Sequence, residues 1–164
     1  MRLTDKQKEA CRILAKDDLY FFSRCMFYTQ KGYVWQQSPH HKIICDYLIR
    51  VYNGEIQNLI INLPPRYSKT QLAVIYFIAW ALGNHPDCEF IHSSYSATLA
   101  SNNSSQIRDL LQNEEYQAIF DTRLKDDSKA KDHWKTTSGG VMYATGAGGT
   151  ITGFGAGKLR DGFG

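Results

Sequence analysis

The sequence Asn58-Leu-Ile-Ile-Asn-Leu-Pro-Pro-Arg-Tyr-Ser-Lys-Thr70 joins an apolar run, a short turn and a Lys-Thr pair. The run from Leu59 to Ile61 predicts a buried strand, and the apolar residues after Lys69-Thr70 predict a helix. In a phosphate-binding loop, backbone N–H groups face the anion, a lysine reaches the terminal phosphates and a hydroxyl ligates Mg²⁺. The stretch alone leaves two interpretations open: such a loop, or an ordinary strand–turn–helix with a solvated Lys69.

The spacing from Leu63 to Lys69-Thr70 fits the pattern G-x-x-x-x-G-K-[ST], but Leu63 and Ser68 occupy both glycine positions. A loop position with positive φ strains a serine, so we expect this loop to bind phosphate less readily than one with glycine.

The length of 164 residues suits one α/β domain, and 43% hydrophobic with 21% charged residues is typical of a soluble globular protein. The net charge of +3 is too small to argue for nucleic-acid binding by itself. Four widely spaced cysteines without a C-x-x-C pair argue against a zinc site or disulfide framework and predict reduced thiols, as in a cytosolic protein. No signal peptide or membrane-spanning run is evident, and the glycine-rich end at Gly164 suggests a truncation.

Strand and helix patterns alternate along the chain and predict an α/β fold with a mostly parallel sheet. Helices are expected over 4–15, 17–28 (aromatic-rich, for packing), 38–54, 71–82 and 96–111, strands over 59–61 and 88–92, and a hairpin around Ser138-Gly139-Gly140.

Three further segments carry polar or glycine-rich patterns. His40 and His41 begin the helix after Ser38, where surface or capping roles are expected rather than joint metal ligation. The charged stretch 121–132 is expected to be a surface loop whose basic residues could touch a phosphate backbone. Residues 146–164 are either a flexible tail or a loop that approaches a ligand.

Taken in order, these motifs resemble the N-terminal ATPase domain of tailed-phage large terminase subunits, the DNA-packaging motors. The resemblance runs from Trp35 to the end of the chain. It is carried by Trp35-Gln36 before Pro39-His40-His41, Leu63–Thr70 as a deviant Walker A motif, Ile91–Ser96, Trp134 with Gly139–Gly146, and Gly148–Gly153.

The resemblance implies an ASCE-type P-loop NTPase, a three-layer sandwich with a mostly parallel central sheet. It divides the chain into an N-terminal helical segment, 1–34, and a partial ATPase domain, 35–164. The Walker B strand with its catalytic carboxylates is expected after Gly164, as is an RNase H-like nuclease domain, so we expect the sheet to be incomplete.

By the same resemblance, Lys69 neutralises phosphate charge and Thr70 ligates Mg²⁺. Arg66 approaches the γ-phosphate as a second catalytic cation, although a salt bridge on the outer face of the loop is the alternative. The remaining nucleotide-binding residues are Pro64, Pro65, Tyr67 and Ser68 in the loop, with Trp35 and Gln36 at the adenine. Phe154 stands where many relatives carry a trans-acting arginine, and Arg160 is the nearby substitute.

The implied activity is ATP hydrolysis, with ATP and Mg²⁺ as cofactors, coupled to moving double-stranded DNA into a capsid. The implied partners are the portal protein, the small terminase subunit and further copies in a ring, in the host-cell cytoplasm and without a membrane; the whole protein would also be an endonuclease. Residues 1–164 alone are expected not to turn over ATP. Two alternatives remain: a helicase-like nucleic-acid-dependent ATPase, and a non-catalytic binding module.

Overall fold

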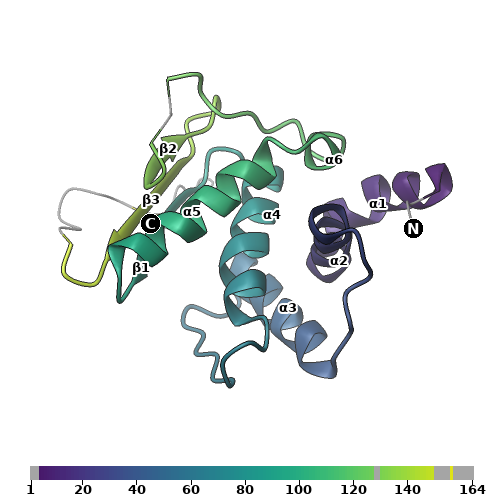
Figure 1. The fold of residues 1–164 in the computed structure, drawn as a ribbon, viewed down its shortest axis with the longest axis horizontal. Helices are drawn as coiled ribbons and strands as arrows, with labels where there is room; N and C mark the ends of the chain where they lie inside the picture. Colours follow the sequence, from purple (N-terminus) through teal and green to yellow (C-terminus); the bar gives the residue numbers. More distant parts are fainter. Residues whose placement is uncertain (1–3, 128–129, 150–155, 157–164) are drawn as a thin grey trace.

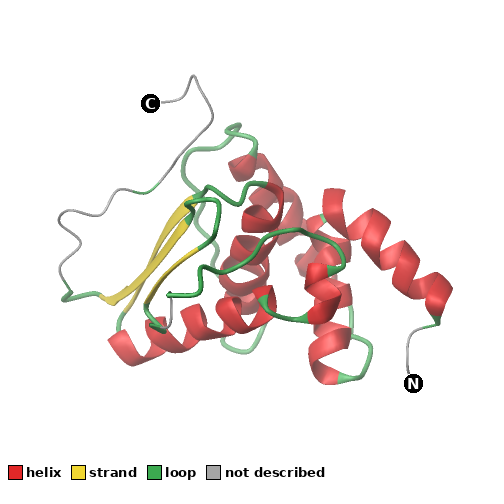
Figure 2. Cartoon of the chain, turned by 90° about the horizontal axis from the view of Figure 1, so that it is seen from above, coloured by secondary structure: helices red, strands yellow, loops and turns green. Residues whose placement is uncertain are grey.

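The computed structural model describes residues 4–127, 130–149 and 156, which form an α/β arrangement of helices and one small sheet (Figures 1 and 2). In chain order the elements are α1 (Asp5–Asp17), α2 (Leu19–Lys31), α3 (Pro39–Tyr52), the π-helix η1 (Gln71–Tyr76), α4 (Phe77–Asn84), β1 (Glu89–Ser94), α5 (Ala97–Leu111), α6 (Glu114–Gln117), β2 (His133–Lys135) and β3 (Val141–Gly146). The predicted α/β class is therefore confirmed.

The sheet has the order β1-β3-β2. Strands β1 and β3 pair in parallel from Glu89↔Val141 to Ser94↔Gly146, and β2 pairs antiparallel with β3. The predicted second strand and the hairpin are both confirmed. Helix α5 runs alongside the sheet (Figure 2). A Cβ on Gly146 would lie 2.9 Å from the Ala97 nitrogen, so glycine lets the end of β3 approach the start of α5.

Local capping explains where several helices begin. Ser96 has extended backbone angles, and its side chain accepts a hydrogen bond from the Leu99 N–H at 3.4 Å at the start of α5. Asp18 caps α2 in the same way through the Phe21 N–H at 2.8 Å. Helix α3 begins at Pro39 as expected, and Gly54 follows its end with φ of +76°.

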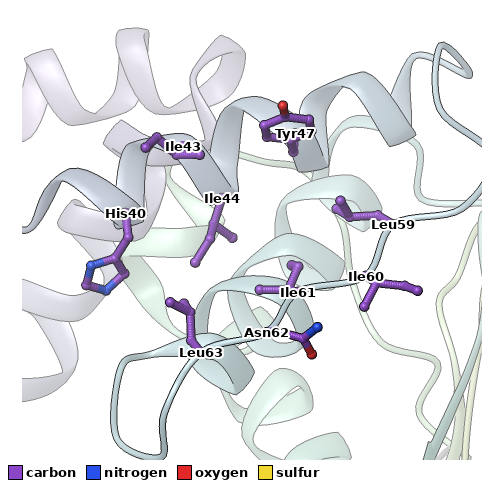
Figure 3. A pocket seen from close by; sticks show the side chains of 9 residues that line it. All are labelled: His40, Ile43, Ile44, Tyr47, Leu59, Ile60, Ile61, Asn62 and Leu63. Atoms are coloured by element: carbon purple, nitrogen blue, oxygen red, sulfur yellow. The ribbon is translucent and has the colours of Figure 1, made fainter.

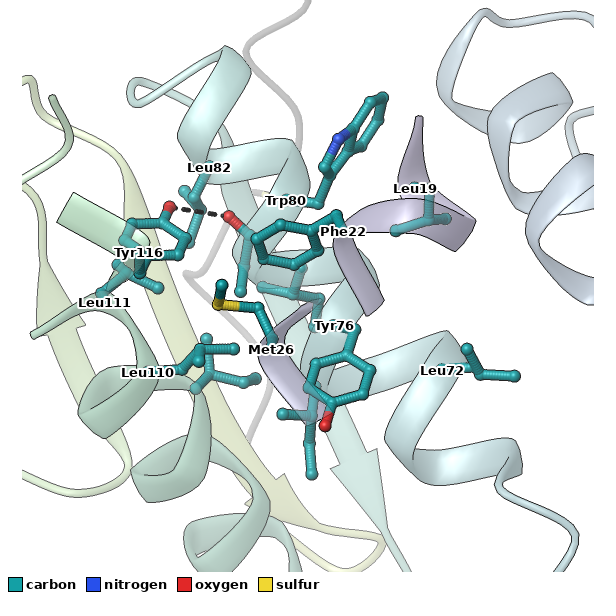
Figure 4. Packing of buried hydrophobic residues seen from close by; sticks show 14 of the residues in the cluster. Leu19, Phe22, Met26, Leu72, Tyr76, Trp80, Leu82, Leu110, Leu111 and Tyr116 are labelled. Atoms are coloured by element: carbon teal, nitrogen blue, oxygen red, sulfur yellow. Dashed lines mark hydrogen bonds between the residues drawn. The ribbon is translucent and has the colours of Figure 1, made fainter. Parts of the chain in front are cut away.

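One core joins the N-terminal helices to the rest of the chain (Figure 4). The Phe22 ring of α2 meets the rings of Tyr76, Tyr116 and Phe120 at centroid distances of 5.8 to 6.4 Å. The buried Tyr116 hydroxyl donates to the Ala79 carbonyl at 2.8 Å. The aromatic residues of α2 thus pack the helix onto the main body, as predicted.

The apolar helix expected after the loop is present, but its first part is a π-helix. Over Gln71–Tyr76 the backbone adopts the wider π geometry, and the Phe77 N–H bonds the Leu72 carbonyl five residues earlier. Leu72, Ile75 and Tyr76 are buried here, and α4 then continues as an apolar α-helix.

The predicted strand over Leu59–Ile61 is wrong. These residues form no strand, and Ile60 is 84% exposed. Leu59, Ile61 and Leu63 still pack against the core, in the alternating pattern of a strand. The reason is the lack of a neighbour: within the described residues, β1, β2 and β3 pair only with one another, and an extended segment becomes a strand only through hydrogen bonds to a partner.

The prediction that all four thiols are reduced is also wrong. The structure joins Cys11 of α1 to Cys25 of α2 by a disulfide, with 6.2 Å between the Cα atoms. The packing of these consecutive helices against each other brings together two residues that are 14 apart in sequence. Cys45 and Cys88 are free, and burial raises the pKa of the Cys45 thiol to about 12.

Among the helices of the described chain, none combines the length and the apolar character that crossing a bilayer requires.

Candidate functional site

The loop between residues 63 and 70 has an unusual backbone. Arg66 has φ of +68° and Ser68 has φ of +62°, and no other non-glycine residue of the described chain has positive φ. The left-handed region favours glycine, so the strain expected at Ser68 is present. Successive N–H groups around such turns line anion-binding concavities in many phosphate sites.

The Lys69 side chain is hydrogen-bonded to the backbone at the start of the loop. Its Nζ donates hydrogen bonds to the carbonyl oxygens of Leu63 and of Pro64, the latter at 3.0 Å. The Ser68 carbonyl accepts from the Leu72 N–H at 2.9 Å, which joins the loop directly to the following helix. The lysine is therefore a half-buried residue tied to the turn, and not the solvated first-turn residue of the simpler interpretation.

The remaining loop side chains are open to solvent. Pro64, Pro65, Arg66, Tyr67 and Thr70 are all exposed, so the Thr70 hydroxyl is accessible to an ion. Within the described residues Arg66 forms no ion pair, which leaves its guanidinium available to an anion.

The sequence around the loop is electropositive. No aspartate or glutamate occurs between Glu55 and Asp87, while Arg66 and Lys69 both lie in the loop. Two cations without a neighbouring acid in the chain favour an anionic ligand over a cationic one.

Trp35 lies in the core and not in an open base-binding site. Its side chain is 8% exposed, and one neighbour is the stacked ring of Phe27 at 5.1 Å. A second neighbour is the tilted His41 ring at 4.5 Å. Gln36 is exposed. An adenine could therefore contact Gln36 without any rearrangement of the protein. Stacking of an adenine on Trp35 would require a neighbouring ring to move aside. Both contacts stay predictions.

The two histidines of α3 differ in their surroundings. His40 Nδ1 is hydrogen-bonded to the hydroxyl of Ser38, the residue that caps the helix, at 2.8 Å. His41 is only 5% exposed, so the surface role expected for it is wrong. Its burial lowers its pKa, and the neighbouring His40 lowers it further.

An apolar pocket of about 290 Å³ lies between α3 and the extended segment before the loop (Figure 3). His40 and Leu63 stand at the same end of it, beside the start of the loop. Its other lining residues are Ile43, Ile44, Tyr47, Leu59, Ile60, Ile61 and Asn62.

Metal binding by protein side chains alone has no support in the described part of the chain, where no group of three or more His, Cys, Asp or Glu residues could hold an ion. A magnesium ion at Thr70 would need a nucleotide to supply most of its oxygen ligands, as is usual for this ion. Arg160 and Phe154 lie outside the described residues, as does most of the glycine-rich end.

Sequence reasoning identified the loop and its cations but missed its neighbours. The proximity of His40 and His41 to the loop comes from the packing of α3 against η1, which connects segments separated by the whole loop. The adjacent pair in the first turn of a helix was the available signal.

No protein-family model, no curated protein and no solved structure matches this chain.

Proposed function

We propose that this chain is the ATP-binding part of a DNA-packaging motor of the terminase type, with the 63–70 loop as its phosphate-binding loop. The observation that carries the proposal is the loop itself: two left-handed residues, a lysine folded over the turn and a helix that begins immediately afterwards. Five motifs in the order found in large terminase subunits support this choice among phosphate-binding proteins.

In the proposed complex, Lys69 leaves the Leu63 and Pro64 carbonyls and pairs with the terminal phosphates. Arg66 is free of ion pairs within the described chain and approaches from the exposed side. The Thr70 hydroxyl joins the coordination of Mg²⁺, which neutralises the charge that develops on the phosphates. The open Gln36 amide is the group best placed to bond the edge of an adenine.

The finer parts of the proposal follow from the family resemblance. They are an ASCE-type P-loop fold, a homo-oligomeric ring, and double-stranded DNA, the portal protein and the small terminase subunit as partners in the host-cell cytoplasm. The unpaired segment before the loop suits a strand position in a larger sheet, because its burial already alternates.

Titration with a fluorescent ATP analogue, with and without Mg²⁺, tests the proposal. We expect saturable binding that is lost in Lys69→Ala and retained in Lys125→Ala, a matched control at an exposed lysine outside the loop. Thr70→Val should remove the part of the affinity that depends on Mg²⁺. ATP turnover by residues 1–164 is expected to be undetectable because no carboxylate of the described residues is paired with the loop; turnover abolished by Lys69→Ala would contradict this expectation.

A non-catalytic binding module is the second candidate, favoured by the strained Ser68 and by the enclosure of Trp35. Absence of binding at millimolar analogue would support it. A helicase-like ATPase shares the loop; ATP-dependent duplex unwinding by the longer protein would favour it over a packaging motor.

A further inference from the structure

Five aromatic rings form a continuous series from α2 to the tip of the 63–70 loop. Phe27 stacks on Trp35 at 5.1 Å, and Trp35 meets His41 at 4.5 Å. His41 meets His40 edge-on at 4.3 Å, and His40 meets Tyr67 at 5.6 Å. We refer to these five residues as the ring series. It gives the exposed loop a side-chain connection to the core that does not involve Lys69.

Two polar atoms within the ring series are buried without a hydrogen-bond partner in the described chain. They are His40 Nε2 and His41 Nδ1. Buried polar atoms are nearly always paired, and exceptions in a native protein call for an explanation. Packing alone would be served better by phenylalanine or leucine, so the imidazoles point to a role that depends on their polarity.

Tyr67 is the residue through which the ring series reaches the loop. It lies between Arg66 and Ser68, the two residues with positive φ. A strained backbone persists only when its surroundings hold it in place. Lys69 holds the loop from inside through two carbonyls, and His40 contacts it from outside through the Tyr67 ring.

We propose that His40 and His41 are positioning residues whose packed rings, with His41 as a neutral imidazole, hold Tyr67 and thereby fix the 63–70 loop in its anion-receiving conformation. Protonation of His41, on which the His40 ring packs, releases Tyr67 and weakens the binding of an anionic ligand to the loop. The structural part of the proposal concerns the loop alone, whereas its consequence for nucleotide affinity rests on the proposed function.

The charged groups around the two histidines explain why a neutral His41 is needed to hold Tyr67. His41 is surrounded by Trp35 from the preceding loop, which carries no charge, and by His40 on its own helix. Beyond these rings, Tyr67 contacts His40 and Tyr76 of η1 contacts Trp35, and neither residue is a carboxylate. The charged groups of the loop are Arg66 and Lys69, both positive. Within the described chain a protonated His41 would thus be buried without an anion, consistent with its lowered pKa.

Fluorine NMR of the chain labelled with 3-fluorotyrosine tests the contact without any nucleotide. The Tyr67 resonance, assigned with Tyr67→Phe, should shift between pH 8 and pH 5.5 in the unmodified chain. In His41→Phe it should keep a ring-shifted position and lose most of its pH dependence, whereas in His40→Ala it should move toward the position of an unfolded tyrosine. The resonance of Tyr95, which is 86% exposed, is the control and should stay constant. A Tyr67 resonance that His40→Ala leaves unchanged would overturn the proposal.

The fluorescent ATP analogue supplies the functional readout. At pH 8 we expect His40→Ala to weaken binding about fivefold or more, a coupling typical of communicating sites, while His40→Phe stays within about twofold. Tyr67→Leu should reproduce the loss and should leave folding intact, because Tyr67 is 49% exposed. Lowering the pH to 5.5 should weaken analogue binding by the unmodified chain more than binding by His41→Phe.

The outcomes separate the two proposals. Equal affinities of the unmodified chain and His40→Ala would overturn the positioning role. If the unmodified chain binds no analogue, the proposed function fails, and the fluorine spectra decide the structural part.

Discussion

Two segments of this chain show that the more apolar one is not the one that forms a strand. Residues 89–94 form β1 and pair along their whole length with β3, although Phe90 and Ile91 are their only apolar residues. Residues 58–63 are more apolar and form no ladder. Leu59, Ile61 and Leu63 contact the core in an alternating pattern, whereas β1 is partly buried at every residue but Ser93. The difference lies in the neighbours: β1 has β3 beside it, and no strand of the described chain lies beside Leu59–Ile61. A strand is therefore a property of a pair, and apolar character gives only the tendency.

The largest effect on stability is expected where the sheet is hydrogen-bonded to helix α5. Trp134 of β2 is buried and donates from its indole nitrogen to the Ser104 hydroxyl of α5 at 2.9 Å. We expect Trp134→Ala to lower the free energy of unfolding by about 3–5 kcal/mol, measured by urea denaturation. Trp134→Phe should cost less, about 1–3 kcal/mol, since it keeps most of the ring and removes only the donor. If Trp134→Ala lowered the free energy of unfolding by less than about 1 kcal/mol, the paired sheet would not be a major source of stability.

A second effect concerns helices α1 and α2, which are joined by a covalent bond, the Cys11–Cys25 disulfide. Reduction of the Cys11–Cys25 disulfide, or Cys25→Ser, should lower the stability by about 3 kcal/mol, as expected for a bond that closes a loop of this length. Thiol counting on the unfolded chain provides the check: two reactive thiols are expected before reduction and four after it. Four before reduction would mean that α1 and α2 are held by packing alone.

A smaller effect of opposite sign is expected in the loop. Ser68→Gly should raise the free energy of unfolding by about 0.5–1 kcal/mol, because relief of a strained φ exceeds the added freedom of the unfolded chain. Ser105→Gly is the matched control: it lies in the interior of α5, where glycine should lower the stability. Equal effects of the two substitutions would contradict a strained Ser68.

The smallest effect is expected in the unpaired segment. Ile60→Ala should change the stability by no more than about 0.5 kcal/mol, since the side chain is 84% exposed. Ile91→Ala, the corresponding isoleucine of β1, should cost more in the same denaturation experiment. A larger cost at Ile60 would show that residues 58–63 pair in solution, and the contrast between the two segments would disappear.

Local signals accounted for most of what the sequence predicted correctly. Ser96 begins α5, Pro39 begins α3, and the Ser138-Gly139-Gly140 turn joins β2 to β3, all from interactions within a few residues. The strain at Ser68 was likewise foreseeable from the spacing to Lys69.

The errors concern contacts between distant segments. The missing ladder at Leu59–Ile61 depends on which strand lies beside it. The Cys11–Cys25 disulfide depends on how α1 packs on α2, and the burial of His41 depends on Trp35 and Phe27. One-dimensional patterns carry little information about such neighbours, because the same pattern is compatible with several tertiary arrangements.

The π-helix between the loop and α4 has a consequence for how the sequence tolerates changes in length. Its wider turn holds more residues than an α-helical turn, so the backbone directly after the loop contains more residues than an α-helix of the same number of turns would need. Removing one residue between Gln71 and Tyr76 could be absorbed by tightening this turn to α geometry, which would leave the buried face of α4 in register with Phe22 and Tyr116. The same deletion within α4 would instead rotate Trp80 out of the core. We therefore expect η1 to let the loop change in length without shifting the buried face of α4.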